Sequence, residues 1–433
     1  MKPNSFLLLY ISLGLLMVQS CKNKPYKMVE QPLSKTQQEA SGAYFTYDYQ
    51  GNAVLCWTEK DDIDSLNRLK YAVFDAATDS FRVAVTVPGS AGMSVVAESA
   101  GKVAFKGDGT VMALFGKRFA EEKSPYAGAI YQTFSSDGGK NWTNNQFLHV
   151  DTAHHYGRGF FDLTTLKDGE LAAVWLDGRF GKTLKGSALF FARTEKGHGF
   201  TEERCLEKGT CECCRTNLLQ DSHGNIHIAY RGIMYPSALT GKEVRDMAYI
   251  YSKDNGKSFS APQIISEDHW QIEGCPHSGP SLAVTGQIVN GVWFTAGGTP
   301  GVYFTKAANG SDFQKRTLLS ATARHPQSLA LKDGRVAVVF EENEPGNPQA
   351  AKETMNHGHA AKSGNHQPAG LSKVVLMVLK DGREEKRITI SEGKHIDHHA
   401  VLSLVAAKIV VAWTREEHGQ SKIFYSSLPV SRL

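Results

Sequence analysis

The chain has 433 residues, of which 41% are hydrophobic, and its 48 Lys and Arg residues nearly balance 44 Asp and Glu residues. This length is sufficient for a large core. Both signs of charge are spread along the chain, so the composition excludes a strongly basic nucleic-acid-binding protein, and we expect no nucleic-acid partner.

The first predicted element is a targeting segment. A basic start at Lys2 precedes an apolar run from Phe6 to Val18 and then Ser20 and Cys21. These features predict a signal over residues 1–20, and the ending "VQSC" resembles a bacterial lipoprotein signal. Residues 21–42 are polar and predict a tether. We therefore expect an exported outer-membrane lipoprotein, held by a lipid on the periplasmic or the surface side; an ordinary signal peptide is the alternative.

A strand pattern ending in an aromatic residue recurs seven times in residues 43–433. The copies end at Trp57, Phe115, Trp175, Tyr230, Trp293, Phe340 and Trp413. Each copy begins with a turn and is flanked by further short apolar runs, so each unit contains about four strands. This repetition predicts an all-β fold in a single domain, a β-propeller of four-stranded antiparallel blades. We expect seven blades, or six if the end units merge, with a strand borrowed from the other terminus to complete the short last unit.

Two turns share a more specific motif. "SSDGGKNW" from Ser135 and "SKDNGKSF" from Ser252 both fit Ser-x-Asp-x-Gly-x-x-aromatic. The aspartate accepts backbone N–H groups and the glycine supplies a positive φ, so the motif predicts a hairpin tip. It resembles the Asp-box, or BNR repeat, of sialidases and related propellers. The resemblance implies a sialidase-like propeller with Asp-boxes between the third and fourth strands of a blade, and it is specific for fold rather than function.

The connections between successive units lie on the opposite face and surround the mouth of the central channel. Before five consecutive units they carry clusters of Cys, His and Arg. The candidate residues in these connections are Arg158, Cys211, Cys213, Cys214, Arg215, Cys275, His277, Arg324, His325, His395, His398 and His399. A histidine-rich insertion, residues 343–371, is predicted on the same face.

One interpretation of this ring is anion recognition. Guanidinium groups bind carboxylates with two parallel hydrogen bonds, and Arg158, Arg215 and Arg324 resemble the arginine triad of sialidases. The segment ending in "LDGR" is similar to the sialidase opening, which implies Asp177 as a general acid beside Arg179 at the pocket rim. The resemblance implies an exo-α-sialidase-like hydrolase, but the family's tyrosine nucleophile has no counterpart at its expected position. The leading hypothesis is binding of an acidic glycan such as a sialoside, with hydrolysis left open.

A second interpretation is a transition-metal site. Thiolates and imidazoles suit zinc or copper, and these are the only cofactors that the sequence suggests. The candidate ligands are Cys211, Cys213, Cys214, Cys275, His277, His325, His395, His398 and His399. The alternative for the cysteines is disulfide bonding in an oxidising compartment, for example between Cys275 and one of the other three. A third interpretation is a monomeric propeller that binds a partner without chemistry.

Overall fold

The computed structural model describes residues 28–34, 38–119, 124, 126–234, 242–272, 274, 276–308, 311–343 and 370–433. The predicted signal, Cys275 and residues 344–369 of the histidine-rich insertion lie outside this set. In the described part of the chain no helix is long and apolar enough to cross a membrane.

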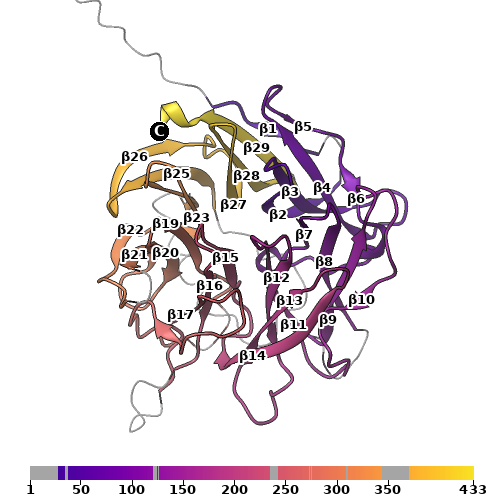
Figure 1. Cartoon of the computed structure of the whole chain (residues 1–433). Coiled ribbons are helices and arrows are strands. Elements are labelled where there is room, and N and C mark those ends of the chain that lie inside the picture. The colour runs from indigo at the N-terminus through magenta and orange to yellow at the C-terminus, as the bar shows by residue number, and fades with distance from the viewer. Residues whose placement is uncertain are drawn as a thin grey trace, which may run out of the picture.

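The fold is a β-propeller whose sheets surround a central axis (Figure 1). The first sheet contains β2 (Ala40–Tyr47), β3 (Ala53–Lys60), β4 (Asn67–Asp75), β5 (Ser80–Phe81) and β6 (Val85–Thr86). The second contains β7 (Lys102–Phe105), β8 (Val111–Arg118), β9 (Gly128–Ser135) and β10 (Gln146–Phe147). The third contains β11 (Arg158–Thr165), β12 (Leu171–Asp177), β13 (Ser187–Thr194) and β14 (Phe200–Thr210).

The remaining sheets follow in chain order. The fourth contains β15 (Asn217–Gln220), β16 (Ile226–Arg231), β17 (Met247–Ser252) and β18 (Gln263–Ile264). The fifth contains β19 (Ser281–Thr285), β20 (Ile288–Thr295), β21 (Gly301–Ala308) and β22 (Thr317–Ser320). The last contains β23 (Ala323–Ala330), β24 (Val336–Asn343), β25 (Ser372–Lys380), β26 (Arg383–Thr389), β27 (Ile396–Val405), β28 (Lys408–Glu417), β29 (Gln420–Pro429) and β1 (Gln31–Pro32). Short 3-10 helices are η1 (Pro88–Ser90), η2 (Ala97–Ser99) and η3 (Val430–Arg432).

The number of separate blades differs from the seven, or six, that the sequence predicts. Among the described residues the hydrogen bonding gives five separate blades and one eight-stranded sheet. The last two repeats share this sheet because one parallel residue pair, Ser372 with Ile396, joins β25 to β27. The prediction of an all-β propeller with four-stranded blades is confirmed.

The ring is closed by both ends of the domain. β1 pairs antiparallel with β29, with Gln31 opposite Tyr425, so the predicted borrowing of a strand is confirmed. The innermost strands β2, β7, β11, β15, β19, β23 and β27 contact one another in this order, and β27 contacts β2 again. The segments that precede these strands therefore meet around one axis.

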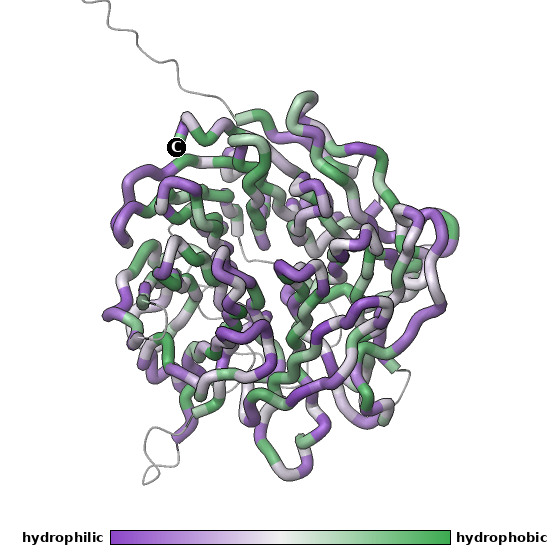
Figure 2. Tube along the Cα trace, viewed as in Figure 1, coloured by the Kyte–Doolittle hydropathy of each residue, from purple (hydrophilic) through white to green (hydrophobic). Residues whose placement is uncertain are grey.

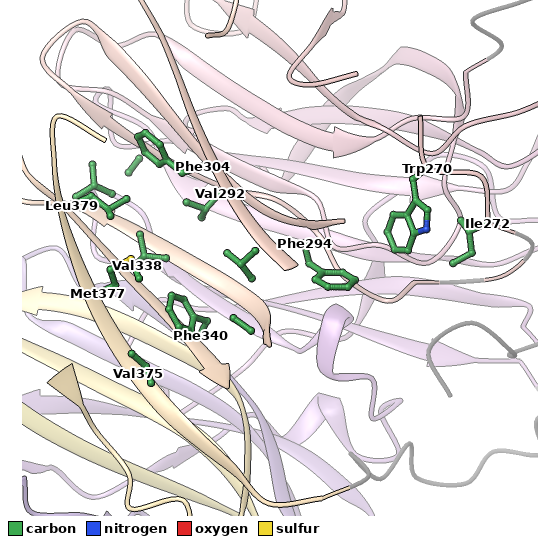
Figure 3. Close-up of a cluster of buried hydrophobic side chains, with 14 residues drawn as sticks. Trp270, Ile272, Val292, Phe294, Phe304, Val338, Phe340, Val375, Met377 and Leu379 are labelled. Carbon is green, nitrogen blue, oxygen red and sulfur yellow. The ribbon is translucent and has the colours of Figure 1, made fainter. Parts of the chain in front are cut away.

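Apolar side chains between neighbouring sheets form the core. Hydrophobic residues follow the strands around the whole ring (Figure 2). Figure 3 shows one such interface, in which Phe294 of β20 and Phe304 of β21 pack with Phe340 of β24 and Met377 of β25. Burial on both faces of a sheet explains why the central strands are almost continuously apolar, and it makes the ring a rigid support for its loops.

The two Asp-box motifs form the predicted hairpin tips. They join β9 to β10 and β17 to β18, the third and fourth strands of their sheets. Asp137 Oδ1 accepts the backbone N–H of Asn141 at 2.9 Å, and Asp254 Oδ1 accepts that of Ser258 at 2.8 Å. Because strands alternate in direction, the connections between sheets lie on the other face of the propeller.

Candidate functional site

Four inner strands begin with the same β-bulge. The register of β2, β11, β23 and β27 with its neighbour shifts within their first residues. The first bulge residues are Gly42, Phe160, His325 and His399, with φ of 70°, 50°, 44° and 51°. A side chain in this conformation costs about 1–2 kcal/mol, and such strain gathers at functional sites. His325 and His399 thus adopt a backbone conformation that is occupied by a glycine, Gly42, at the equivalent position of β2.

His325 and His399 stack on each other at the channel mouth. Their ring centroids are 4.0 Å apart with an interplanar angle of 20°. Nδ1 of His325 bonds to the Glu341 carboxylate, and Nδ1 of His399 lies 2.6 Å from Nδ1 of His398, whose Nε2 is 3.1 Å from Glu416. These partners fix the orientation of both rings. The His325 and His399 side chains remain 20% and 21% exposed, so neither is fully closed to solvent.

A buried carboxylate lies beside the histidine pair. Glu98 Oε1 accepts from Nη1 of Arg215 at 2.9 Å, and Oε2 accepts the backbone N–H of Gly279 at 3.1 Å. Nε2 of His399 is 3.8 Å from Glu98 Oε1. One potential ligand atom from each of Glu98, His325 and His399 lies within 4.8 Å of the others. Segments that are far apart in the chain therefore meet at one point; we call Glu98, Arg215, His325 and His399 the axial cluster.

The two histidines of the axial cluster have pKa values displaced in opposite directions. Burial disfavours the charged form of His325, but the Glu341 carboxylate outweighs this and raises its pKa above 6.5. Burial lowers the pKa of His399 well below 6.5, and the charges of His325, His398 and Arg215 lower it further. At any pH between these two pKa values the pair holds one neutral imidazole beside one that retains its proton, which is the arrangement of an acid and a base.

Arg158, Asp177 and Arg179 form a separate buried network. Asp177 is inaccessible to solvent and accepts from Nε of Arg158 at 3.2 Å and Nη2 of Arg179 at 2.7 Å. Arg158 also bonds to Asp151, and Arg179 to Glu203. The structure places none of these three residues in the axial cluster, and both of their guanidinium groups already have carboxylate partners.

The strand register explains why the side chains of Arg158 and Arg324 point in different directions. In β23, Arg324 and Glu341 are the last residue pair before the bulge. In β11 the last such pair is Gly159 with Leu176, and Arg158 with Asp177 is the pair before it. A shift of one residue turns a strand side chain to the other face. Arg324 packs 4.0 Å from the Phe294 ring, and burial lowers its pKa to about 10. Its one hydrogen bond among the described residues runs from Nη1 to the Ala323 carbonyl, so most of its donors are left for a ligand.

The other predicted histidines are placed less centrally. His277, with φ of 45°, is close enough to lower the pKa of His399 through its charge. His395 lies apart, 3.7 Å from Glu417, in a surface hollow of about 440 Å³ shared with Met28 and Glu392. A second hollow of about 380 Å³, between Lys380 and Glu385, contains none of the predicted site residues.

Glu98, Glu341 and Glu416 were missed by the sequence analysis. Glu98 stands shortly before the second repeat, at the place where other repeats carry Cys, His or Arg, and this position is the signal that identifies it. Glu341 and Glu416 end strands, where acidic residues are common, so nothing local distinguishes them.

Cys211, Cys213 and Cys214 form a second cluster, between β14 and β15. Sγ of Cys211 is 3.7 Å from that of Cys213 and 3.6 Å from that of Cys214, so no disulfide joins Cys211 to either. Hydrogen bonds from these two thiols lower the pKa of Cys211 well below its usual value, and the charge of Arg245 adds to this. Both this cluster and the Glu98, His325 and His399 group have the spacing of metal ligands. The oxygens of Glu98 already accept N–H groups, which favours the thiols as the metal site.

The sequence matches no protein-family model and no curated protein sequence. Among solved structures the chain is similar to the BP39L lectin of Burkholderia pseudomallei, with a TM-score of 0.58 and 8% identity over 90% of this chain and 96% of the lectin. It is also similar to a PL25 ulvan lyase bound to an oligosaccharide of GlcA and Rha3S, with a TM-score of 0.55 and 10% identity over 92% and 95% of the two chains.

A sialidase is a weaker match. The NanB sialidase of Streptococcus pneumoniae has a TM-score of 0.48 and 10% identity over 90% of this chain and 86% of that one. Likeness at these identities shows the propeller fold alone. Membership of the sialidase family stays a prediction.

Proposed function

We propose that the channel mouth binds an acidic glycan and that His325 and His399 cleave it by acid–base chemistry. The observation that carries this proposal is the stacked pair of histidines, held in strained bulges from two strands and displaced in pKa in opposite directions. Strained histidines whose pKa values are displaced in opposite directions are costly for a scaffold and useful for proton transfer.

The charges at the site support an acidic ligand. Arg324 has hydrogen-bond donors left and rests on an apolar ring, and a desolvated guanidinium binds a carboxylate strongly. His325 adds a second positive charge when protonated. The ulvan lyase neighbour was solved with a uronate-containing, sulfated oligosaccharide, which agrees with a ligand of this class.

Among cleavage reactions, elimination fits the residues better than hydrolysis. An inverting hydrolase needs room for a water between its two groups, whereas the two imidazoles are stacked at 4.0 Å. In an elimination His399 takes the proton from the carbon beside a uronate carboxylate and that electron pair forms a C=C bond. The C–O bond to the leaving sugar breaks, and the leaving oxygen takes a proton from His325. No nucleophile is required, in agreement with the missing tyrosine.

The test uses the mature chain with a glucuronate–sulfated rhamnose oligosaccharide, a sialyl-oligosaccharide and neutral dextran. We expect binding to the acidic glycans only and an unsaturated uronate product, detected by its ultraviolet absorption. The His399→Ala variant should lose about 100-fold or more in kcat with little change in Kd. The Arg324→Ala variant should weaken binding about 10-fold, since hydrogen bonds to charged groups contribute about 1.5–3 kcal/mol.

His198→Ala is the matched control. His198 is exposed in the turn between β13 and β14, on the opposite face, so its loss should change neither rate nor affinity. Preference for dextran, or full activity in His399→Ala, contradicts the proposal. Release of free sialic acid would show that the protein hydrolyses its substrate instead of cleaving it by elimination. Binding without any product would show that the protein is a lectin and would refute the acid–base step.

We also propose that the eight-stranded sheet acts as two blades, which brings the total to seven. β23–β26 and β27–β29 with β1 each follow the strand order of the separate blades, and β23 and β27 both belong to the inner ring. An experimental structure with β23 and β27 at separate radial positions supports this count, and one continuous layer contradicts it.

A further inference from the structure

The cysteine cluster lies where the chain passes from the outermost strand of one sheet to the innermost strand of the next. Cys211 directly follows β14, and its backbone N–H donates to the carbonyl of Arg231 in β16 at 2.9 Å. The tight turn that follows brings Cys213 and Cys214 back towards Cys211. A short local segment anchored to a strand therefore supplies three thiols at one point.

The spacing of the three sulfurs fits a bound ion. The Sγ separations of 3.6 and 3.7 Å are far longer than a disulfide of about 2.05 Å. Zinc binds thiolate sulfur at about 2.3 Å, so sulfurs at neighbouring corners of a tetrahedron around it are about 3.8 Å apart. The observed separations match this edge, and all three sulfurs lie within 4.8 Å of one another.

The surroundings favour a thiolate at Cys211. Cys211, Cys213 and Cys214 are 0%, 5% and 2% exposed, and Phe160 packs against them. Nη1 of Arg245, a buried side chain, points at Sγ of Cys211 from 3.2 Å. Arg245 also contacts Glu212 at 3.3 Å and Glu243 at 3.5 Å.

A second guanidinium strengthens this argument. Arg231 is 1% exposed and its guanidinium donates to the carbonyls of Arg245, Ser278 and Phe294. Its positive charge favours the ionised form of Cys211, which further lowers the pKa of that thiol. The N–H group that Arg245 directs at Cys211 is poorly matched by a neutral thiol, because a thiol is a weak hydrogen-bond acceptor. A metal-bound thiolate is a stronger acceptor than a neutral thiol, and the N–H···S contact from Arg245 is the kind of outer interaction that orients a metal ligand.

We propose that Cys211, Cys213 and Cys214 form a metal site for one thiolate-bound Zn²⁺ or Cu⁺ ion. Soft sulfur ligands select these two ions, and the thiols release their protons when the ion binds. The site is independent of the proposed glycan chemistry. It fixes the turn immediately before Arg215, so the ion also stabilises the part of the ring that carries the ion pair with Glu98.

The test measures metal content and thiol reactivity on the full mature chain purified without chelator. We expect about one equivalent of zinc or copper per chain, with the cluster thiols resistant to alkylation until the metal is removed. Cys205 is exposed on β14 and serves as an internal reference that reacts before and after metal removal. Metal-free protein is then reconstituted separately with Zn²⁺ and, under ascorbate, with Cu⁺, which distinguishes the two ions.

Cys213→Ser should lose the metal and Cys205→Ser should keep it. If Cys213→Ser does not fold, a Cd²⁺ titration of metal-free wild type replaces it, with one equivalent expected to saturate the thiolate-to-metal absorption band. The proposal is overturned by a disulfide that includes any of the three cysteines, by metal that persists in Cys213→Ser, by the absence of a Cd²⁺ band, or by protein that contains no metal as purified and whose cluster thiols already react as fast as Cys205.

Discussion

The starts of β11, β23 and β27 share one backbone conformation but differ in the side chain found at the same position. All three have the same bulge with a positive φ at its first residue. At β11 this residue is Phe160, which packs on the cysteine cluster. At β23 and β27 it is a histidine, and the two histidines stack at the axis. The scaffold therefore offers the same position in several sheets, and the residue type decides between packing and chemistry.

The charged groups near these bulges differ in the same way. Beside β11, Arg158 and Asp177 are saturated by their own network and closed to solvent. Beside β23, Arg324 has a single hydrogen bond among the described residues and is adjacent in the chain to the partly exposed His325. An arginine at the channel mouth thus stabilises the fold in one sheet and remains available to a ligand in another.

The largest effect that separates these two regions is expected at Asp177. Asp177→Ala leaves Arg158 and Arg179 buried without their shared partner, which should lower the free energy of unfolding by about 3–5 kcal/mol. Denaturant unfolding measures the loss. Asp333→Ala is the matched control, because Asp333 also pairs with an arginine but is half exposed, and it should cost about 1 kcal/mol or less. Equal losses in the two variants would show that the Asp177 network contributes no more than a surface pair.

A smaller effect is expected in the pH dependence of cleavage. His399 must be neutral to accept a proton, and its lowered pKa keeps it neutral above an acidic limb well below pH 6.5. His325 must be protonated to donate, and its raised pKa keeps activity up to an alkaline limb above pH 6.5. Glu341→Gln removes the carboxylate that raises the pKa of His325, so the alkaline limb should move to lower pH. An unchanged alkaline limb in this variant would exclude His325 as the acid.

The repeat pattern predicted the fold well because strand and turn chemistry is local. The recurring aromatic-ended strands and the Asp-boxes around Asp137 and Asp254 depend on short segments, and the strand borrowed at β1 was inferred from the short last repeat. The sharing of one sheet by the last two repeats was missed, because it depends on a single pair, Ser372 with Ile396, that joins two repeats.

The site was predicted only in part, for reasons of register and distance. Arg215 lies just before the inner strand β15, and His325 and His399 lie near the starts of β23 and β27, so their grouping follows from repeat positions that the sequence shows. Arg158 was grouped with Arg324 although a shift of one residue separates their directions. Glu98 forms hydrogen bonds with Arg215 and Gly279, which are 117 and 181 residues away in the chain, and no local sequence pattern predicts such contacts.

The smallest effect tests whether the histidine bulge is strained. At His399, alanine and glycine both remove the imidazole, but only glycine relaxes a φ of 51°. His399→Gly should therefore be more stable than His399→Ala by about 1 kcal/mol. At His398, which is not among the described residues with positive φ, glycine should instead be less stable than alanine by about 0.5–1 kcal/mol, because it loses more freedom on folding.

This opposite sign at adjacent residues separates strain from any general effect of glycine at the channel mouth. Denaturant midpoints of the four variants, with equal slopes, give the two differences directly. If glycine is the less stable choice at both positions, the bulge at His399 stores no strain. The backbone of β27 is then relaxed, and the case for a functional histidine rests on the ring stack and its partners alone.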